Sequence, residues 1–254
     1  MFCGLWRSVM TICEVRRLGL VPYAEAWELQ KDLAARRAAD EIPDTLLLLE
    51  HPHTYTLGRS GSAENLLLDE AQLKARGVEV HWVDRGGDIT YHGPGQLVGY
   101  PILKLGRLQI AEDGQLLRAD YVGYVRRIEE MLIRVLARFG LVAGQVRGLT
   151  GVWIQPDVAS RCPHCPPAAR QRPSKIAAIG VKVDARGVSQ HGFALNVNPD
   201  MGYWDGIVGC GLSDHASISM ADLLGDAPPT EVVMDEVVKQ FGKVFARETR
   251  ERIA

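Results

Sequence analysis

The chain of 254 residues lacks the features that mark membrane proteins and nucleic-acid-binding proteins. No apolar run reaches the roughly 18 residues that a membrane-spanning helix needs, and Arg7 interrupts the N-terminal apolar stretch before a signal-peptide core can form. The formal net charge is -2, so the chain lacks the excess of basic residues that is typical of a large nucleic-acid-binding surface. We therefore expect a globular cytoplasmic protein that binds neither membrane nor nucleic acid.

Cysteine is scarce, and its five copies are spread unevenly over Cys3, Cys13, Cys162, Cys165 and Cys210. An odd, uneven set does not build a disulfide framework, so we expect mostly free thiols. The motif CPHC has the spacing of half a zinc site, but no second Cys-x-x-C or histidine pair lies near it in the sequence. Structural cysteines are the favoured interpretation of this motif, with an accessory metal or a disulfide as the alternative.

Hydrophobic residues make up 46% of the chain, which is enough for a substantial core. Apolar positions at helical spacing predict helices over 22–40, 119–140, 217–225 and 230–254. Other apolar runs predict strands over 44–52, 78–84, 95–105, 150–155, 175–184 and 188–198. The DARG sequence between the last two strands predicts a hairpin turn.

We expect one main domain over residues 1–220, with an irregular extension over 1–14 and an inserted loop over 156–174. Residues 221–254 are expected to add a C-terminal helical segment of the same domain. The inserted loop holds five prolines and several arginines without periodicity, so it is predicted to be exposed and mobile.

The segment RGGDITYHGPGQLVGYP, residues 85–101, holds five glycines around a Tyr-His pair between two predicted strands. Glycine allows a ligand or another backbone to approach closely, and a loop that is held on strands is a good place for a site. His51 and His53 precede a turn nearby in the sequence and are candidates for the same cavity, although turn histidines without a catalytic part are more common.

Cys210 is the candidate nucleophile, because glycines flank it in the stretch DGIVGCGLSDHAS. Flanking glycines expose a thiol and free neighbouring backbone amides to act as oxyanion donors. A buried, unreactive cysteine in a turn is the alternative. A reactive thiol needs a nearby cation or base; the candidates are Lys175, Lys182, His92, His191 and His215.

The alternation of side chains between the two faces of a strand, here called strand parity, distinguishes the two lysines. Lys175 shares its parity with Ala177 and Ile179, whereas Lys182 shares the parity of Ala178. In a regular strand, Lys175 therefore points toward the more apolar side. Burial disfavours the ammonium form and makes such a lysine a plausible proton acceptor for a thiol. The alternative is a lysine at the start of a strand whose amine reaches water.

Six motifs occur in this order over most of the chain: HPHTYTLGR, RGGDITYHGPGQLVGYPIL, TGVWI, KIAAIGVKV, HGFALNVN and GIVGCGL. In this combination the sequence resembles the lipoyl (octanoyl) transferase family, the octanoyl-acyl carrier protein:protein N-octanoyltransferases. The resemblance implies an α/β (α+β) fold with a mixed sheet flanked by helices, similar to the catalytic module of biotin and lipoate protein ligases, with a small C-terminal subdomain. Residues 1–220 would then be a catalytic acyltransferase domain.

The resemblance also implies residues and partners. By position, the family's thioester-forming cysteine falls on Cys210 and the lysine that tunes it falls on Lys175. The donor is octanoyl-acyl carrier protein; the acceptors are lipoyl domains of 2-oxoacid dehydrogenase complexes and the glycine cleavage H protein; no ATP, cofactor or metal is implied. The implied substrate-binding residues are Arg85, Gly86, Gly87, Asp88, Ile89, Thr90, Tyr91, His92, Ala178, Ile179, Gly180, Gly192, Phe193 and Ala194.

Two departures from the family and two rival functions stand beside this resemblance. Gly209 replaces the proline that usually precedes the cysteine, and the insertion before Lys175 is longer than usual. Its arginines, Arg161, Arg170 and Arg172, are candidates for docking acidic partners. An ATP-dependent lipoate or biotin ligase is one rival function, and a non-catalytic acyl-binding protein is the other.

Overall fold

The structure, a computed structural model, describes residues 11–106, 109–110, 116–117, 120–209 and 215–252. Within these ranges, no helix has both the length and the apolar character needed to cross a membrane. Cys3 and Cys210 lie outside the described residues.

An eight-stranded mixed sheet forms the centre of the molecule, in the order β13-β1-β2-β6-β12-β11-β10-β9. β13, β1 and β2 are parallel, and each neighbouring pair from β2 to β9 is antiparallel. The strands of this sheet are β1 (Thr11–Leu20), β2 (Asp44–Glu50), β6 (Gln96–Ile102), β9 (Gly144–Val146), β10 (Leu149–Ile154), β11 (Ser174–Val183), β12 (Ser189–Asn196) and β13 (Arg247–Glu251).

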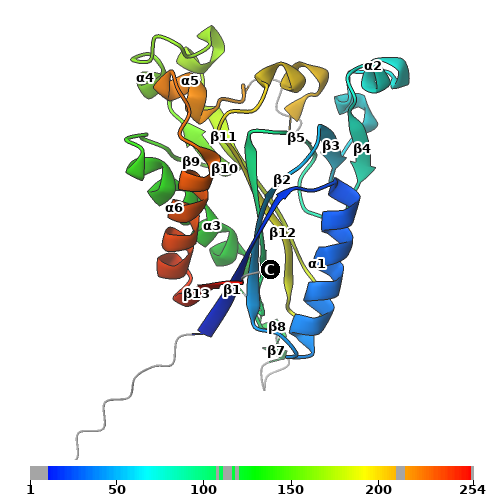
Figure 1. Cartoon of the computed structure of the whole chain (residues 1–254). Coiled ribbons are helices and arrows are strands. Elements are labelled where there is room, and N and C mark those ends of the chain that lie inside the picture. The colour runs from blue at the N-terminus through cyan, green and yellow to red at the C-terminus, as the bar shows by residue number, and fades with distance from the viewer. Residues whose placement is uncertain (1–10, 107–108, 111–115, 118–119, 210–214, 253–254) are drawn as a thin grey trace, which may run out of the picture.

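Helices cover both faces of this sheet (Figure 1). Helix α1 (Tyr23–Ala38) packs on one face, and α3 (Tyr121–Arg138) and α6 (Thr230–Val244) pack together on the other. The leucine run of β2 shows why both faces are apolar: Leu47 and Leu49 join the core beneath α1, whereas Leu46 and Leu48 join the core beneath α3 and α6. Because successive side chains of a strand point to opposite faces, one continuous leucine run serves both cores.

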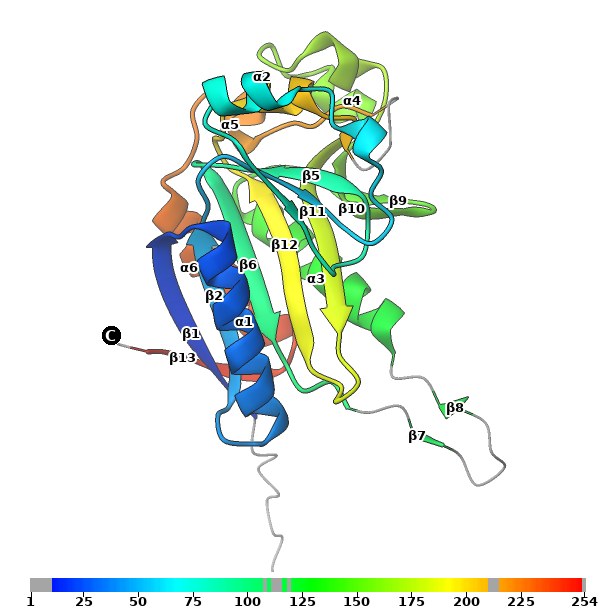
Figure 2. The same ribbon diagram turned by 90° about the vertical axis from the view of Figure 1, so that its right-hand side faces the viewer.

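A three-stranded sheet, in the order β4-β3-β5, crosses one end of the large sheet (Figure 2). It encloses a third apolar core, which includes Tyr55, Leu57 and Ile89. Residues 93–95 connect β5 directly to β6, so the glycine-rich segment links the two sheets. The elements outside the large sheet and its main helices are β3 (Thr54–Leu57), η1 (Ala63–Asn65), α2 (Glu70–Ala75), β4 (Glu79–Trp82), β5 (Ile89–His92), β7 (Gln109–Ile110), β8 (Leu116–Leu117), α4 (Pro156–Ala159), η2 (Pro167–Arg170), η3 (Met201–Gly206) and α5 (Met220–Leu224).

The mixed α/β architecture and the predicted DARG hairpin are confirmed. Two finer expectations were wrong in part. β1 begins at Thr11, so the stretch 11–14 is not irregular. The C-terminal segment is not wholly helical, because β13 follows α6 and pairs with β1. The charged residues of β13, in the sequence RETRE, suit an exposed edge strand, but they also fit the end of the preceding helical pattern.

The inserted loop is mostly exposed, as predicted, but it has structure of its own. It contains α4 and η2, and its two cysteines, Cys162 and Cys165, are buried. Both thiols are free, and both sulfur atoms point to the carbonyl oxygen of Asp222 in α5, at 3.0 and 3.7 Å. Burial, aided by the neighbouring Cys162, raises the pKa of Cys165 to about 12. No group of three or more His, Cys, Asp or Glu side chains in the described part of the chain is placed to hold a metal ion.

Candidate active site

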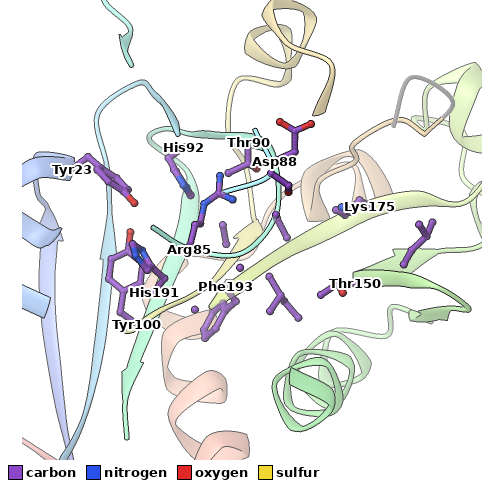
Figure 3. Close-up of a pocket in the computed structure, with 18 of the residues that line it drawn as sticks. Tyr23, Arg85, Asp88, Thr90, His92, Tyr100, Thr150, Lys175, His191 and Phe193 are labelled. Atoms are coloured by element: carbon purple, nitrogen blue, oxygen red, sulfur yellow. The ribbon is translucent and has the colours of Figure 1, made fainter. Parts of the chain in front are cut away.

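A cavity of about 230 Å³ lies where the glycine-rich segment meets β11 and β12 (Figure 3). All but three of the expected substrate-binding residues line it. The exceptions are Gly86, Ile89 and Tyr91. Ile89 and Tyr91 are fully buried in the third core instead, because β5 alternates and directs Thr90 and His92 to the cavity. The lining residues are Tyr23, Ser60, Arg85, Gly87, Asp88, Thr90, His92, Tyr100, Gly148, Leu149, Thr150, Lys175, Ala178, Ile179, Gly180, His191, Gly192, Phe193 and Ala194.

The glycines around the cavity let backbones approach one another. A Cβ on Gly180 would lie 2.9 Å from the carbonyl oxygen of Gly86, and one on Gly192 would lie 2.1 Å from that of Gly99. The amide of Gly86 donates a hydrogen bond to Val181 of β11 at 3.0 Å. The segment is therefore docked on the sheet by its own backbone, which explains part of its glycine content without any ligand.

Arg85 fixes the segment to the small sheet. Its guanidinium donates to the carbonyl oxygen and the hydroxyl of Thr56 in β3, at 2.6 and 2.9 Å. A further bond of 3.0 Å reaches the carbonyl oxygen of Gly86. The side chain is buried although it lines the cavity. Arg85 thus places a positive charge behind one wall while its donors hold the loop in shape.

The histidines of the two sequence motifs take different places. His92 lines the cavity; its Nδ1 contacts Gln96 Oε1 at 2.8 Å and its Nε2 contacts the Thr56 hydroxyl at 3.3 Å. His51 is fully buried behind Tyr100 and does not line the cavity, and His53 bonds the Tyr91 hydroxyl outside it. Burial lowers the pKa of His92 well below its ordinary value and lowers that of His51 to about 4.

His191 lies at one end of the cavity in a left-handed backbone conformation, with φ at 57°. Its amide donates to the Gln30 side chain at 2.7 Å, and its Nε2 lies 2.9 Å from an Asp84 oxygen. The other Asp84 oxygen accepts from Lys182 at 2.5 Å. Hydrogen bonds from His191 and Lys182 hold the pKa of Asp84 far below its usual value, whereas burial lowers the pKa of His191. The structure therefore uses Lys182 to support His191, a role that strand parity did not indicate.

Lys175 lies at the other end of the cavity and is 8% exposed. The parity argument that placed it with Ala177 was wrong, because β11 is not regular: Val152 pairs with Ala177 but the next residue, Trp153, pairs with Lys175. One residue of β11 bulges out, so Lys175 faces the cavity together with Ala178. Its amine lies 4.7 Å from the centre of the Trp153 ring. The side chain is therefore mostly buried rather than extended over the surface.

A second cavity, of about 470 Å³, lies on the other side of Lys175. Lys175 is the one residue that lines both cavities within the described part of the chain. Gly209 and His215 line the second cavity. These are the last described residue before Cys210 and the first after the segment 210–214. Ala216 accepts a hydrogen bond of 2.9 Å from the amide of Lys175, which holds this part of the chain beside the lysine.

Sequence reasoning missed several lining residues. Tyr23 lies in the predicted helix over 22–40 and Tyr100 in the predicted strand over 95–105, but neither was expected at the site. The cavity also includes Leu149 and Thr150 of β10. No local signal singles these residues out, because each reaches the cavity through packing between elements that are distant in the sequence.

The family model of the lipoyl protein ligase A/B catalytic domain matches residues 22–242. Curated relatives named octanoyltransferase include that of Chloroflexus aurantiacus strain J-10-fl, 46% identical over 95% of this chain and 97% of the relative. The octanoyltransferase of Rubrobacter xylanophilus is 45% identical over 91% of this chain and 93% of the relative.

Solved structures of similar fold are lipoate protein ligases. A bi-partite lipoate protein ligase from Thermoplasma acidophilum has a TM-score of 0.64 at 16% identity, over 96% of this chain and 88% of that one. A lipoate-protein ligase A bound with ATP has a TM-score of 0.63 at 15% identity, over 96% and 90%. At these identities the structures show the fold alone, but the matched residues and the curated relatives establish that this chain belongs to the lipoyl protein ligase A/B catalytic domain family.

Proposed function

We propose that this protein transfers an octanoyl group from acyl carrier protein to a lysine of lipoyl domains, through a thioester on Cys210. The observation that carries the proposal is the position of buried Lys175 between two cavities, one of which is bordered by Gly209, next to Cys210. The relatives named octanoyltransferase, at 45–46% identity, support the same activity. The acceptors in this proposal are 2-oxoacid dehydrogenase lipoyl domains and the glycine cleavage H protein.

The first half-reaction forms the acyl-enzyme. Lys175, as the neutral amine, takes the proton of the Cys210 thiol, and the thiolate attacks the carbonyl carbon of the octanoyl thioester. The bond from that carbon to the carrier's sulfur breaks, and the carrier leaves as a thiol with the proton from Lys175. The acyl chain lies in the first cavity, whose apolar walls include Ile179 and Phe193.

The second half-reaction releases the product. The acceptor lysine, as the neutral amine, attacks the Cys210 thioester, an amide bond forms, and the carbon–sulfur bond breaks. The proton from the attacking nitrogen returns to the Cys210 sulfur by way of Lys175. Proton transfer by a positioned side chain is typically worth ~10²–10⁴ in rate. The energy of the thioester drives both steps, so the proposal includes no ATP, cofactor or metal.

The proposal includes a docking surface for the acidic partners at the inserted loop. Arg161, Arg170 and Arg172 are exposed there. One nitrogen of Arg170 already donates to the carbonyl oxygens of Cys162 and Pro163, at 3.2 Å each, which stiffens the loop. Fixed arginines cost less ordering on binding than free ones.

An ATP-dependent ligase on the same fold is the second candidate, because a ligase of this fold binds ATP. It would activate free octanoate as an adenylate and would have no use for Cys210. The transferase needs the thioester donor and no nucleotide. The two functions therefore differ in donor and in their dependence on the cysteine.

Intact-protein mass spectrometry after mixing the protein with octanoyl-acyl carrier protein, without ATP, tests the proposal. We expect a hydroxylamine-labile octanoyl adduct on the natural protein, none on Cys210→Ser, and labelling at least ~10²-fold slower on Lys175→Ala. Cys13→Ser is the control, because Cys13 is buried in the core and should label normally. Lack of any adduct, while octanoate and ATP together modify a lipoyl domain, would establish the ligase instead.

A further inference from the structure

The end of the acyl cavity farthest from Lys175 is polar rather than apolar. Figure 3 shows the hydroxyl oxygens of Tyr23 and Tyr100 pointing toward one another beside the His191 ring, with Lys175 and Thr150 at the opposite end. An acyl chain that ends in a methyl group does not need such groups. Their presence raises the question of what they bind.

The hydrogen-bond network determines which atoms at this end can accept a hydrogen bond from a ligand. His51 Nδ1 donates to the carbonyl oxygen of Val21 at 2.7 Å, so its Nε2 accepts from the Tyr100 hydroxyl, also at 2.7 Å. The Tyr100 hydrogen is therefore committed to His51. What the Tyr100 oxygen offers on its other side is a lone pair, which is a hydrogen-bond acceptor.

His191 offers a second acceptor. Asp84 is ionised and accepts from Nε2 at 2.9 Å, and burial keeps the imidazole neutral, so Nδ1 carries a lone pair. This atom is buried and makes no hydrogen bond to any residue that the structure describes. The Thr90 hydroxyl oxygen, also in the cavity wall, is likewise buried without a partner among these residues.

An acceptor without a partner in a buried wall costs free energy, and the backbone conformation of His191 adds a second cost. His191 holds a left-handed backbone that non-glycine residues rarely adopt, and Gln30 and Asp84 hold it in place. A ring fixed this firmly, with one nitrogen left over, fits a ligand that brings a hydrogen-bond donor.

We propose that this end of the cavity, formed by Tyr23, Tyr100 and His191, is a subsite for a hydroxyl group at the far end of the acyl chain. The protein would then transfer medium-chain acyl groups that carry a terminal hydroxyl as well as plain octanoyl. The inference rests on the proposed function, since it concerns the far end of the same acyl cavity. The bonds made and broken at Cys210 are the same for both chains.

The span of the cavity is compatible with such a chain. Five residue steps along β11 separate Lys175 from Gly180, which is at most roughly 16 Å at about 3.3 Å per residue. Lys175 lies at one end of this span and the two tyrosines lie at the other (Figure 3).

The test compares octanoyl with 8-hydroxyoctanoyl on acyl carrier protein, by kcat/KM for transfer to a lipoyl domain. A wholly apolar end would reject the buried hydroxyl by roughly 5- to 150-fold. We expect instead that the natural protein transfers the two chains within about threefold of each other. Decanoyl should be transferred at least about tenfold more slowly than octanoyl, because its methyl end would press on the polar groups.

Two variants assign the effect to the subsite. Tyr23→Phe removes one hydroxyl without adding volume, and His191→Asn removes the imidazole while tolerating the left-handed backbone. Each should lower the ratio of kcat/KM for 8-hydroxyoctanoyl to that for octanoyl by about tenfold. Tyr124→Phe is the matched control, since Tyr124 is fully buried on α3 and does not line the cavity; its ratio should not change.

The outcomes separate the two proposals. Normal octanoyl transfer with at least thirtyfold slower 8-hydroxyoctanoyl transfer would overturn the subsite and leave the proposed function standing. Equal ratios in the natural protein and both cavity variants would also overturn it. Failure of octanoyl transfer itself would count against the proposed function.

Discussion

At the scale of single residues, the glycines of the cavity wall give a sharp prediction. A methyl group at Gly192 would lie 2.1 Å from the carbonyl oxygen of Gly99 and 2.7 Å from Pro101, so β12 and β6 would have to separate. We expect Gly192→Ala to destabilise the fold by ~1–3 kcal/mol, measured by urea denaturation. Gly144→Ala is the control, because nothing lies within 4 Å of its added carbon. Equal stability of the two variants would contradict this packing.

Most of the cavity wall and its Lys175 end could be predicted from the sequence, but the end formed by Tyr23 and Tyr100 could not. The glycine-rich segment stands out by its composition, whereas Lys175 and the wall residues of β11 and β12 were indicated by the family resemblance. The bulge that turns Lys175 toward the cavity appears only in the pairing with β10, which no pattern in β11 alone reveals. Tyr23 and His191 could not be predicted as neighbours, because their proximity depends on how α1 packs on β12.

At the scale of elements, one buried carboxylate holds the β9–β10 hairpin, which contributes to the cavity wall. Glu129 of α3 is fully buried and accepts hydrogen bonds from the amide of Gly151 at 3.1 Å and from Gln145 at 2.7 Å. Arg126 pairs with it at 2.6 Å. Gly151 lies in β10, directly after Leu149 and Thr150 of the cavity wall. The helix thereby positions two strands of the site.

We expect Glu129→Ala to cost ~1–3 kcal/mol of stability, because it leaves the buried amide of Gly151 without its acceptor and removes the partner of Gln145. Hydrogen exchange should rise at 144–151 more than elsewhere, which distinguishes a loosened hairpin from general destabilisation. Glu129→Gln keeps one acceptor oxygen, so its stability should lie between that of the natural protein and that of Glu129→Ala. Unchanged exchange at this hairpin in Glu129→Ala would show that β11 alone orders it.

Among the elements, the long amphipathic helices and the apolar strands were predictable, because period and burial coincide in them. The C-terminal strand was not, since its charged residues read as the end of a helix. Its place depends on β1, more than 200 positions earlier in the chain, to which it pairs from Thr11↔Arg247 onward. Local patterns carry no information on a partner at that separation.

At the scale of the whole molecule, the neutral histidines around the cavity make the fold sensitive to acid. Burial lowers the pKa of His51 from 6.5 to about 4, and also lowers the pKa values of His92 and His191. Between pH 6.5 and about 4, these histidines are protonated in the unfolded chain but stay neutral in the folded chain. Their contribution to the free energy of unfolding is therefore complete above about pH 6.5 and is lost as the pH falls toward 4.

His51 alone should remove roughly 2 kcal/mol between pH 7.5 and pH 5, and the other two histidines should add to this loss. Urea denaturation at several pH values measures the slope. His51→Gln should be less stable at pH 7.5, since the contacts to Val21 and Tyr100 are altered, but should lose less stability on acidification than the natural protein. A slope that is identical in the natural protein and in His51→Gln would mean that carboxylates, not the histidines around the cavity, govern the acid response.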